Sequence, residues 1–68
     1  MNKYNLYVGA SFKWLDKKNK ECFGIITRLE RFDVRMVVKT PTIRKHLRFD
    51  VLEQLDIELS LYKAEQVE

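Results

Sequence analysis

The chain has one cysteine, Cys22, and one histidine, His46, and these are the side chains whose types are suited to catalysis. Together with Asp50 they match a thiol nucleophile, a general base and a carboxylate that orients the base. Cys22, however, lies in a segment rich in β-branched and apolar residues, and nothing around it in the sequence indicates a lowered thiol pKa. We therefore expect that the protein is not an enzyme.

Cofactor sites are also not indicated. A structural zinc site takes four ligands of the Cys and His type, and this chain has two such residues. A glycine-rich phosphate loop is not possible either, because Gly9 and Gly24 are the only glycines. The sequence predicts no cofactor and no metal.

The strongest candidate for function is a set of basic side chains between residues 28 and 48. Arginine presents planar, permanently charged donors that suit phosphate, and an aromatic ring beside them can stack on a nucleic-acid base. We expect this set to bind nucleic acid or a nucleoprotein; it consists of Arg28, Arg35, Lys39, Arg44, Lys45 and Arg48. The alternative is a solvated sheet face that is balanced by the acidic residues between 50 and 68.

A second candidate is Phe32, which lies between Arg31 and Asp33 at the tip of a short polar turn. An exposed aromatic residue at such a tip often anchors a protein contact. The alternative function is therefore a protein-binding adaptor or a small inhibitor of the phage or mobile-element type. A homo-oligomer is a variant of this hypothesis, because a short chain with many apolar residues needs to bury them.

These side chains must be positioned by strands. Residues 21–29 and 33–39 are rich in β-branched residues and predict a hairpin whose turn is residues 30–32. Gly24 indicates a bulge, a bend or a close approach inside the first of these strands. Residues 9–15 predict another strand, with Phe12 and Trp14 on its core face or in an aromatic pocket for a cation. Residues 16–20 predict an exposed loop.

The second half of the chain has an ambiguous period. For residues 43–49 we favour a strand, followed by one helical turn at 50–54; the alternative is one helix over 42–55 on a hairpin sheet. Residues 55–62 alternate apolar and polar types, which predicts a last strand. Residues 63–68 are expected to be a polar tail without structure of its own.

This order of elements resembles SH3-like small barrels of the Tudor and KOW kind. The residues that carry the resemblance are Gly9-x-x-Phe12-x-Trp14-x-Asp16, Phe23-Gly24-Ile25-Ile26, Val34-x-Met36-x-Val38 and Phe49-Asp50-Val51-Leu52-Glu53-Gln54-Leu55. The resemblance implies a mainly β fold, a partly open barrel of about five strands, and a binding module for peptides, modified side chains or nucleic acid. No ligand site carries over from it residue by residue.

The length of 68 residues indicates a single small domain. Its stability is expected to depend on large side chains such as Trp14, Phe23 and Met36, or on a partner subunit that covers an exposed sheet. No stretch approaches the roughly 20 apolar residues of a membrane span, and the first nine residues do not resemble a signal peptide. With one cysteine, which cannot form an internal disulfide, we expect a cytoplasmic protein that does not contact membranes.

Overall fold

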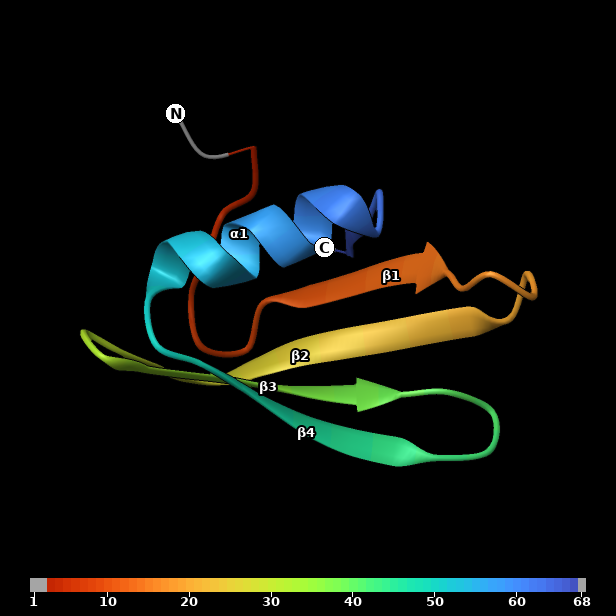
Figure 1. Ribbon diagram of the computed structural model, residues 1–68, viewed down its shortest axis with the longest axis horizontal. Coiled ribbons are helices and arrows are strands. Elements are labelled where there is room, and N and C mark those ends of the chain that lie inside the picture. Colours follow the sequence, from red (N-terminus) through yellow and green to blue (C-terminus); the bar gives the residue numbers. More distant parts are fainter. Residues whose placement is uncertain (1–2, 68) are drawn as a thin grey trace.

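The computed structural model describes residues 3–67, which form one antiparallel sheet and one helix (Figure 1). The elements in chain order are β1 (Ser11–Leu15), β2 (Glu21–Glu30), β3 (Asp33–Lys39), β4 (Arg44–Phe49), α1 (Leu52–Leu61) and β5 (Glu65–Val67). The five strands lie in the order β4-β3-β2-β1-β5, so the sheet is not closed, and α1 packs on one of its faces. The expectation of a mainly β fold with about five strands is confirmed.

The predicted hairpin is formed by β2 and β3, with its turn at residues 31–32. The register shifts between Ile26 and Arg28, which makes Thr27 the extra residue of a bulge. Because of this shift, Ile26 pairs with Met36 and points toward α1, whereas Arg28 pairs with Arg35 on the opposite face.

Gly24 marks a close approach and not the bulge, since it keeps a regular register with both neighbouring strands. A Cβ at this position would lie 2.9 Å from Met36 Sδ and 3.0 Å from the nearest Trp14 ring carbon. The missing side chain therefore provides the space in which these two side chains pack.

The prediction of a strand over residues 55–62 is wrong, because these residues belong mostly to α1. The single helical turn predicted at 50–54 is likewise too short, and the alternative helix over 42–55 is misplaced, since residues 44–49 form the predicted strand. Leu55 and Leu59 are spaced by one helical turn as well as by a strand period, and both are fully buried against the sheet. The apolar face of the sheet requires a cover, and these leucines supply it.

The expectation that residues 63–68 have no structure of their own is wrong for residues 65–67. These residues form β5, which pairs with the free edge of β1. Gln66 holds this strand to the N-terminal segment: Asn5 N donates to Gln66 Oε1 at 2.9 Å, and Gln66 Nε2 donates to Asn5 O at 2.8 Å. Residue 68 of the expected tail lies outside the described residues, as do residues 1 and 2.

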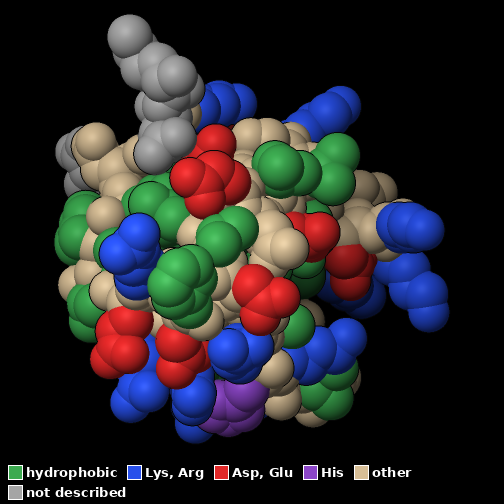
Figure 2. All heavy atoms as spheres, turned by 60° about the vertical axis from the view of Figure 1, so that its left-hand side comes forward, with side chains coloured by type: hydrophobic (Ala, Val, Ile, Leu, Met, Phe, Trp, Pro, Cys, Tyr) green, Lys and Arg blue, Asp and Glu red, His purple; other side chains and the backbone are tan. Residues whose placement is uncertain are grey.

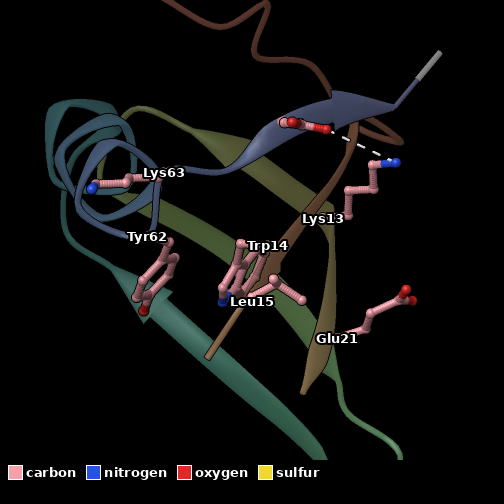
Figure 3. A pocket seen from close by; sticks show the side chains of 7 residues that line it. Lys13, Trp14, Leu15, Glu21, Tyr62 and Lys63 are labelled. Carbon is pink, nitrogen blue, oxygen red and sulfur yellow. Dashed lines mark ion pairs between the residues drawn. The ribbon is translucent and has the colours of Figure 1, made fainter. Parts of the chain in front are cut away.

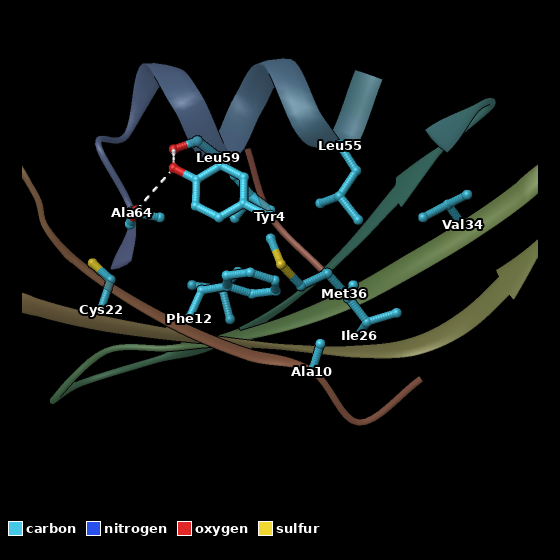
Figure 4. Packing of buried hydrophobic residues seen from close by; sticks show 11 residues of the cluster. Tyr4, Ala10, Phe12, Cys22, Ile26, Val34, Met36, Leu55, Leu59 and Ala64 are labelled. Atoms are coloured by element: carbon cyan, nitrogen blue, oxygen red, sulfur yellow. Dashed lines mark hydrogen bonds between the residues drawn. The ribbon is translucent and has the colours of Figure 1, made fainter. Parts of the chain in front are cut away.

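The core lies between α1 and the sheet (Figure 4). Tyr4 is buried there, and its ring packs edge to face with that of Phe12, with 5.5 Å between the ring centroids. The Tyr4 hydroxyl lies 2.8 Å from Ala64 O and 3.1 Å from Leu59 O. Met36 is fully buried as expected, whereas Phe23 is 46% exposed. Phe23 thus belongs to the opposite face of the sheet, and the expectation that it stabilises the core is wrong.

Candidate functional site

The sheet face that points away from α1, called the open face below, carries an ordered array of side chains. Alternate residues of each strand project to this face, and the register sets side chains of neighbouring strands directly opposite one another. One such cross-strand row has a single aromatic ring among three cations, namely Lys13, Phe23, Lys39 and Arg44. At the edge of the sheet the row continues to Glu65 on β5, which lies 3.9 Å from Lys13. An aromatic ring is therefore presented to solvent between basic groups on adjacent strands.

The next row of the open face is mostly apolar. It consists of Val67, Ser11, Ile25, Val37 and His46. Ile25 is 41% exposed and lies next to Phe23 along the face, two residues further on β2. Exposed apolar side chains that adjoin in this way are typical of a binding surface.

The third row contains three arginines, Arg28, Arg35 and Arg48, from three adjacent strands. Asp33 holds them together. Its Oδ1 accepts from Arg35 Nε at 2.9 Å and from Arg48 Nε at 3.2 Å, and its Oδ2 accepts from Arg28 Nη1 and Arg35 Nη2, both at 3.1 Å. These hydrogen bonds, foremost that from Arg35, lower the pKa of Asp33 to about 2.

One carboxylate thus gathers three guanidinium groups, and Glu30 adds a second acidic partner for Arg28 at 3.9 Å. Arg48 also donates to Asp50 Oδ1 at 2.9 Å, and Figure 2 shows acidic side chains among basic ones at this end of the molecule. A hollow of about 460 Å³ opens beside the cluster and is lined by Arg35, Arg48 and His46. Because a guanidinium has five N–H donors, Arg28 and Arg35 keep donors available for an anion.

The structure brings five of the six predicted basic residues onto the open face, namely Arg28, Arg35, Lys39, Arg44 and Arg48. Lys45 is the exception. It pairs with Val38 and projects to the face that carries α1, so its inclusion in the same basic surface is wrong. The charge balance of the alternative interpretation is present in part, because Asp50 pairs with Arg48 and Glu65 lies 3.9 Å from Lys13. Glu53, Asp56 and Glu58, in contrast, lie on α1, across the sheet from these arginines.

Cys22 and His46 lie on opposite faces of the sheet. Cys22 is buried on the face of the sheet that carries α1, and burial raises the pKa of its thiol, whereas His46 is on the open face opposite Val37. The sketched arrangement of Cys22, His46 and Asp50 is therefore not formed. Among residues 3–67, no three His, Cys, Asp or Glu side chains are placed so that they could hold a metal ion.

Phe32 lies at the turn between β2 and β3, as predicted, and 65% of its surface is exposed. Arg48 Nη2 donates to its carbonyl at 3.2 Å, and the Arg31 guanidinium lies 5.3 Å from its ring centroid. The aromatic tip is thus held beside the arginine cluster and points into solvent.

Two residues of the open face, Lys13 and Phe23, were not among the predicted site residues. In β2 both alternating sets are apolar: Phe23 and Ile25 face solvent, while Cys22 and Ile26 are buried. Composition alone gives no preference between these faces. The one available signal is Gly24, because a glycine on the inner set makes room for Trp14 and Met36 and thereby directs Phe23 outward.

Comparison of the chain with models of known families, with curated proteins and with solved structures finds no match. The resemblance to SH3-like barrels therefore stays a prediction. No helix within residues 3–67 is long and apolar enough to span a membrane.

Proposed function

We propose that the protein binds single-stranded nucleic acid on its open face. The observation that carries this proposal is the cross-strand row of Lys13, Phe23, Lys39 and Arg44. An exposed ring flanked by cations is the combination that single strands require, because bases stack on the ring and phosphates pair with the cations. The resemblance to small barrels that bind nucleic acid supports the same assignment.

The dimensions of the row agree with this proposal. From Lys13 on β1 to Arg44 on β4 the row crosses three strand spacings, which is about 14 Å. A base stacked on Phe23 therefore has basic groups on both sides of it within the reach of its own backbone. The arginine cluster, with its remaining N–H donors, lies further along the strands, toward the turn of β2 and β3.

A single strand is favoured over a duplex by the position of the helix. Direct reading of duplex DNA requires an element that enters the major groove, most often a helix. Here α1 lies on the other side of the sheet and carries acidic residues such as Glu53 in its first turn. A phosphate backbone is repelled by that surface, whereas a strand of bases fits the flat open face.

The test is the binding of a labelled oligothymidine, followed by fluorescence anisotropy at several salt concentrations. The affinity is expected to fall linearly with salt on a double logarithmic plot, because counterions are released. Phe23→Ala is expected to weaken binding by about 5-fold to 150-fold, which corresponds to the stacking of one base.

The matched control is Phe32→Ala, which removes an exposed aromatic ring outside this row. It is expected to leave the affinity for oligothymidine unchanged. Absence of salt-dependent binding, or equal losses from both substitutions, would contradict the proposal.

The exposure of Phe32 favours a second candidate function, the capture of a protein partner by an adaptor or small inhibitor. Its ring is more exposed than that of Phe23, and its carbonyl is fixed by Arg48. An anchor residue of a protein contact has this combination of exposure and rigidity. If wild-type protein retains a protein partner that Phe32→Ala loses and Phe23→Ala keeps, this second function is favoured.

A further inference from the structure

The face that carries α1 also contains a groove, which α1 does not cover. It has a volume of about 540 Å³ and lies between the loop of residues 16–20, the turn of residues 40–43 and the C-terminal end of α1. Its apolar floor is formed by Cys22, Val38 and Leu47. The Trp14 and Tyr62 rings stack at 4.7 Å and form one wall, as Figure 3 shows from the neighbouring hollow.

The rim of the groove is basic. Lys18, Lys20 and Lys45 line it, against one acid, Asp16. The Asp16 carboxylate already accepts from Lys18 N at 2.8 Å and Lys20 N at 2.9 Å within its own loop, which lowers its pKa. In the described part of the chain, none of the three lysines forms an ion pair. An apolar floor with unneutralised lysines fits a partner that is both apolar and acidic.

The outer side of α1 has this complementary character. Its solvent-exposed stripe follows the helical period and consists of Glu53, Gln54, Ile57, Ser60 and Leu61. Ile57 is 57% exposed and Leu61, one turn later, is 71% exposed. Asp56 and Glu58 flank the stripe, and no basic residue lies in the last turn of the helix. The chain thus exposes an acidic, apolar helix face.

We propose that the groove binds the exposed stripe of α1 from a second copy of this chain, and that the two copies exchange this contact symmetrically. Ile57 and Leu61 of one copy would lie on the floor beside Trp14, and the acidic residues of α1 would face the lysines of the rim. Charge complementarity selects this pairing, because two grooves or two α1 stripes placed against each other would repel.

The geometry allows a two-fold arrangement. The groove and α1 lie side by side on the same face of the sheet, since Tyr62 directly follows the helix and lines the groove. A two-fold rotation therefore places each helix, about 15 Å long, over the other copy's groove. Each contact is then made twice, and both open faces remain on the outside of the dimer.

The test is the mass of the purified protein, free of nucleic acid, over about 1 to 300 µM and at about 50 and 500 mM salt. A dimer has twice the 8.2 kDa of one chain. We expect it to form as concentration rises and to weaken at the higher salt. Lys45→Glu and Glu53→Lys should each raise the dissociation constant of the homodimer by about tenfold or more.

A mixture of these two variants should restore the dimer, because each groove then again faces a helix of opposite charge. Arg44→Glu, on the open face, is the matched control and should not change the mass. Circular dichroism confirms that each variant is folded. A monomer at all concentrations, or a dimer that neither charge reversal weakens, would overturn the proposal. The same holds if a wild-type monomer binds only an unrelated acidic peptide in this groove.

Discussion

Arg48 Nε lies 3.2 Å from Asp33 Oδ1, although fifteen positions separate the two residues in the sequence. Through this contact and those of Arg28 and Arg35, one carboxylate joins guanidinium groups from β2, β3 and β4. Like charges directly opposite one another on a sheet are destabilising, and Asp33 offsets this repulsion. The arginines of the open face can thus lie together without a ligand.

The low pKa of Asp33 predicts a loss of stability in acid. Its pKa is about 2 in the folded protein, below the ordinary 3.8, so folding favours the charged carboxylate. This contribution is fully present above the ordinary value and is lost as the pH falls from 3.8 to about 2. Urea unfolding at several pH values should show a smaller acid-induced loss for Asp33→Asn than for the wild type. Parallel curves for the two proteins would refute this role of Asp33.

Tyr4→Phe tests the contact of the N-terminal segment with α1 and with Ala64, which precedes β5. The substitution keeps the ring against Phe12 but removes the hydroxyl that lies 2.8 Å from Ala64 O. We expect a decrease in the free energy of unfolding of about 1 kcal/mol, measured by urea denaturation. Tyr7→Phe is the control, because Tyr7 is exposed and a surface change is close to neutral. Equal effects at both positions would contradict the assignment.

Gly24→Ala tests the packing between β2 and its neighbours. The added methyl would lie 2.9 Å from Met36 Sδ and 3.0 Å from the Trp14 ring, so at least one of these side chains must move. Overpacking of this kind should lower the free energy of unfolding by about 1 to 2 kcal/mol. Trp14 is the only tryptophan, and its fluorescence should report the displacement directly. If neither the emission nor the stability changes, the Met36 and Trp14 side chains do not fill the space beside Gly24, and this packing is refuted.

Arg44 and Lys45 are neighbours in sequence but project to opposite faces of the sheet, so alanine substitutions should separate the two proposed surfaces. Arg44→Ala is expected to reduce the salt slope of oligothymidine binding by about 0.7, the value of one phosphate contact on a single strand. Lys45→Ala should leave this slope unchanged and should weaken only self-association. The reverse pattern would place nucleic acid in the groove.

Much of the sheet could be predicted from the sequence because its signals are local. The segment of β3 alternates cleanly, and Pro41 ends it, since proline cannot donate to a ladder of hydrogen bonds. The helix could not be predicted in the same way. Leu55, Ile57, Leu59 and Leu61 satisfy a strand period, while Leu55 and Leu59 also satisfy a helical one. The choice between these periods depends on which face of the sheet needs a cover, and this is a tertiary property.

The candidate site was predictable in composition but not in orientation. The basic residues of β3 and β4 are evident in the sequence, whereas their assignment to a face depends on register. A shift of one residue would exchange Arg44 with Lys45 and Phe23 with Cys22. The bulge at Thr27 also changes which residues of β2 share a face, since it sets Arg28 beside Arg35. Sequence patterns around residues 26–28 contain no clear sign of it.

The contacts of Tyr4 and Gln66 have a kinetic consequence. Both join segments about sixty residues apart, with separations of 60 for Tyr4 and Ala64 and 61 for Asn5 and Gln66. Closing so long a loop is slow, whereas the hairpins from β1 to β4 close short ones. The N-terminal segment and β5 should thus acquire protection from hydrogen exchange last during refolding, after the four-stranded meander has formed. The rate-limiting step of folding would then be the meeting of the two ends of the chain.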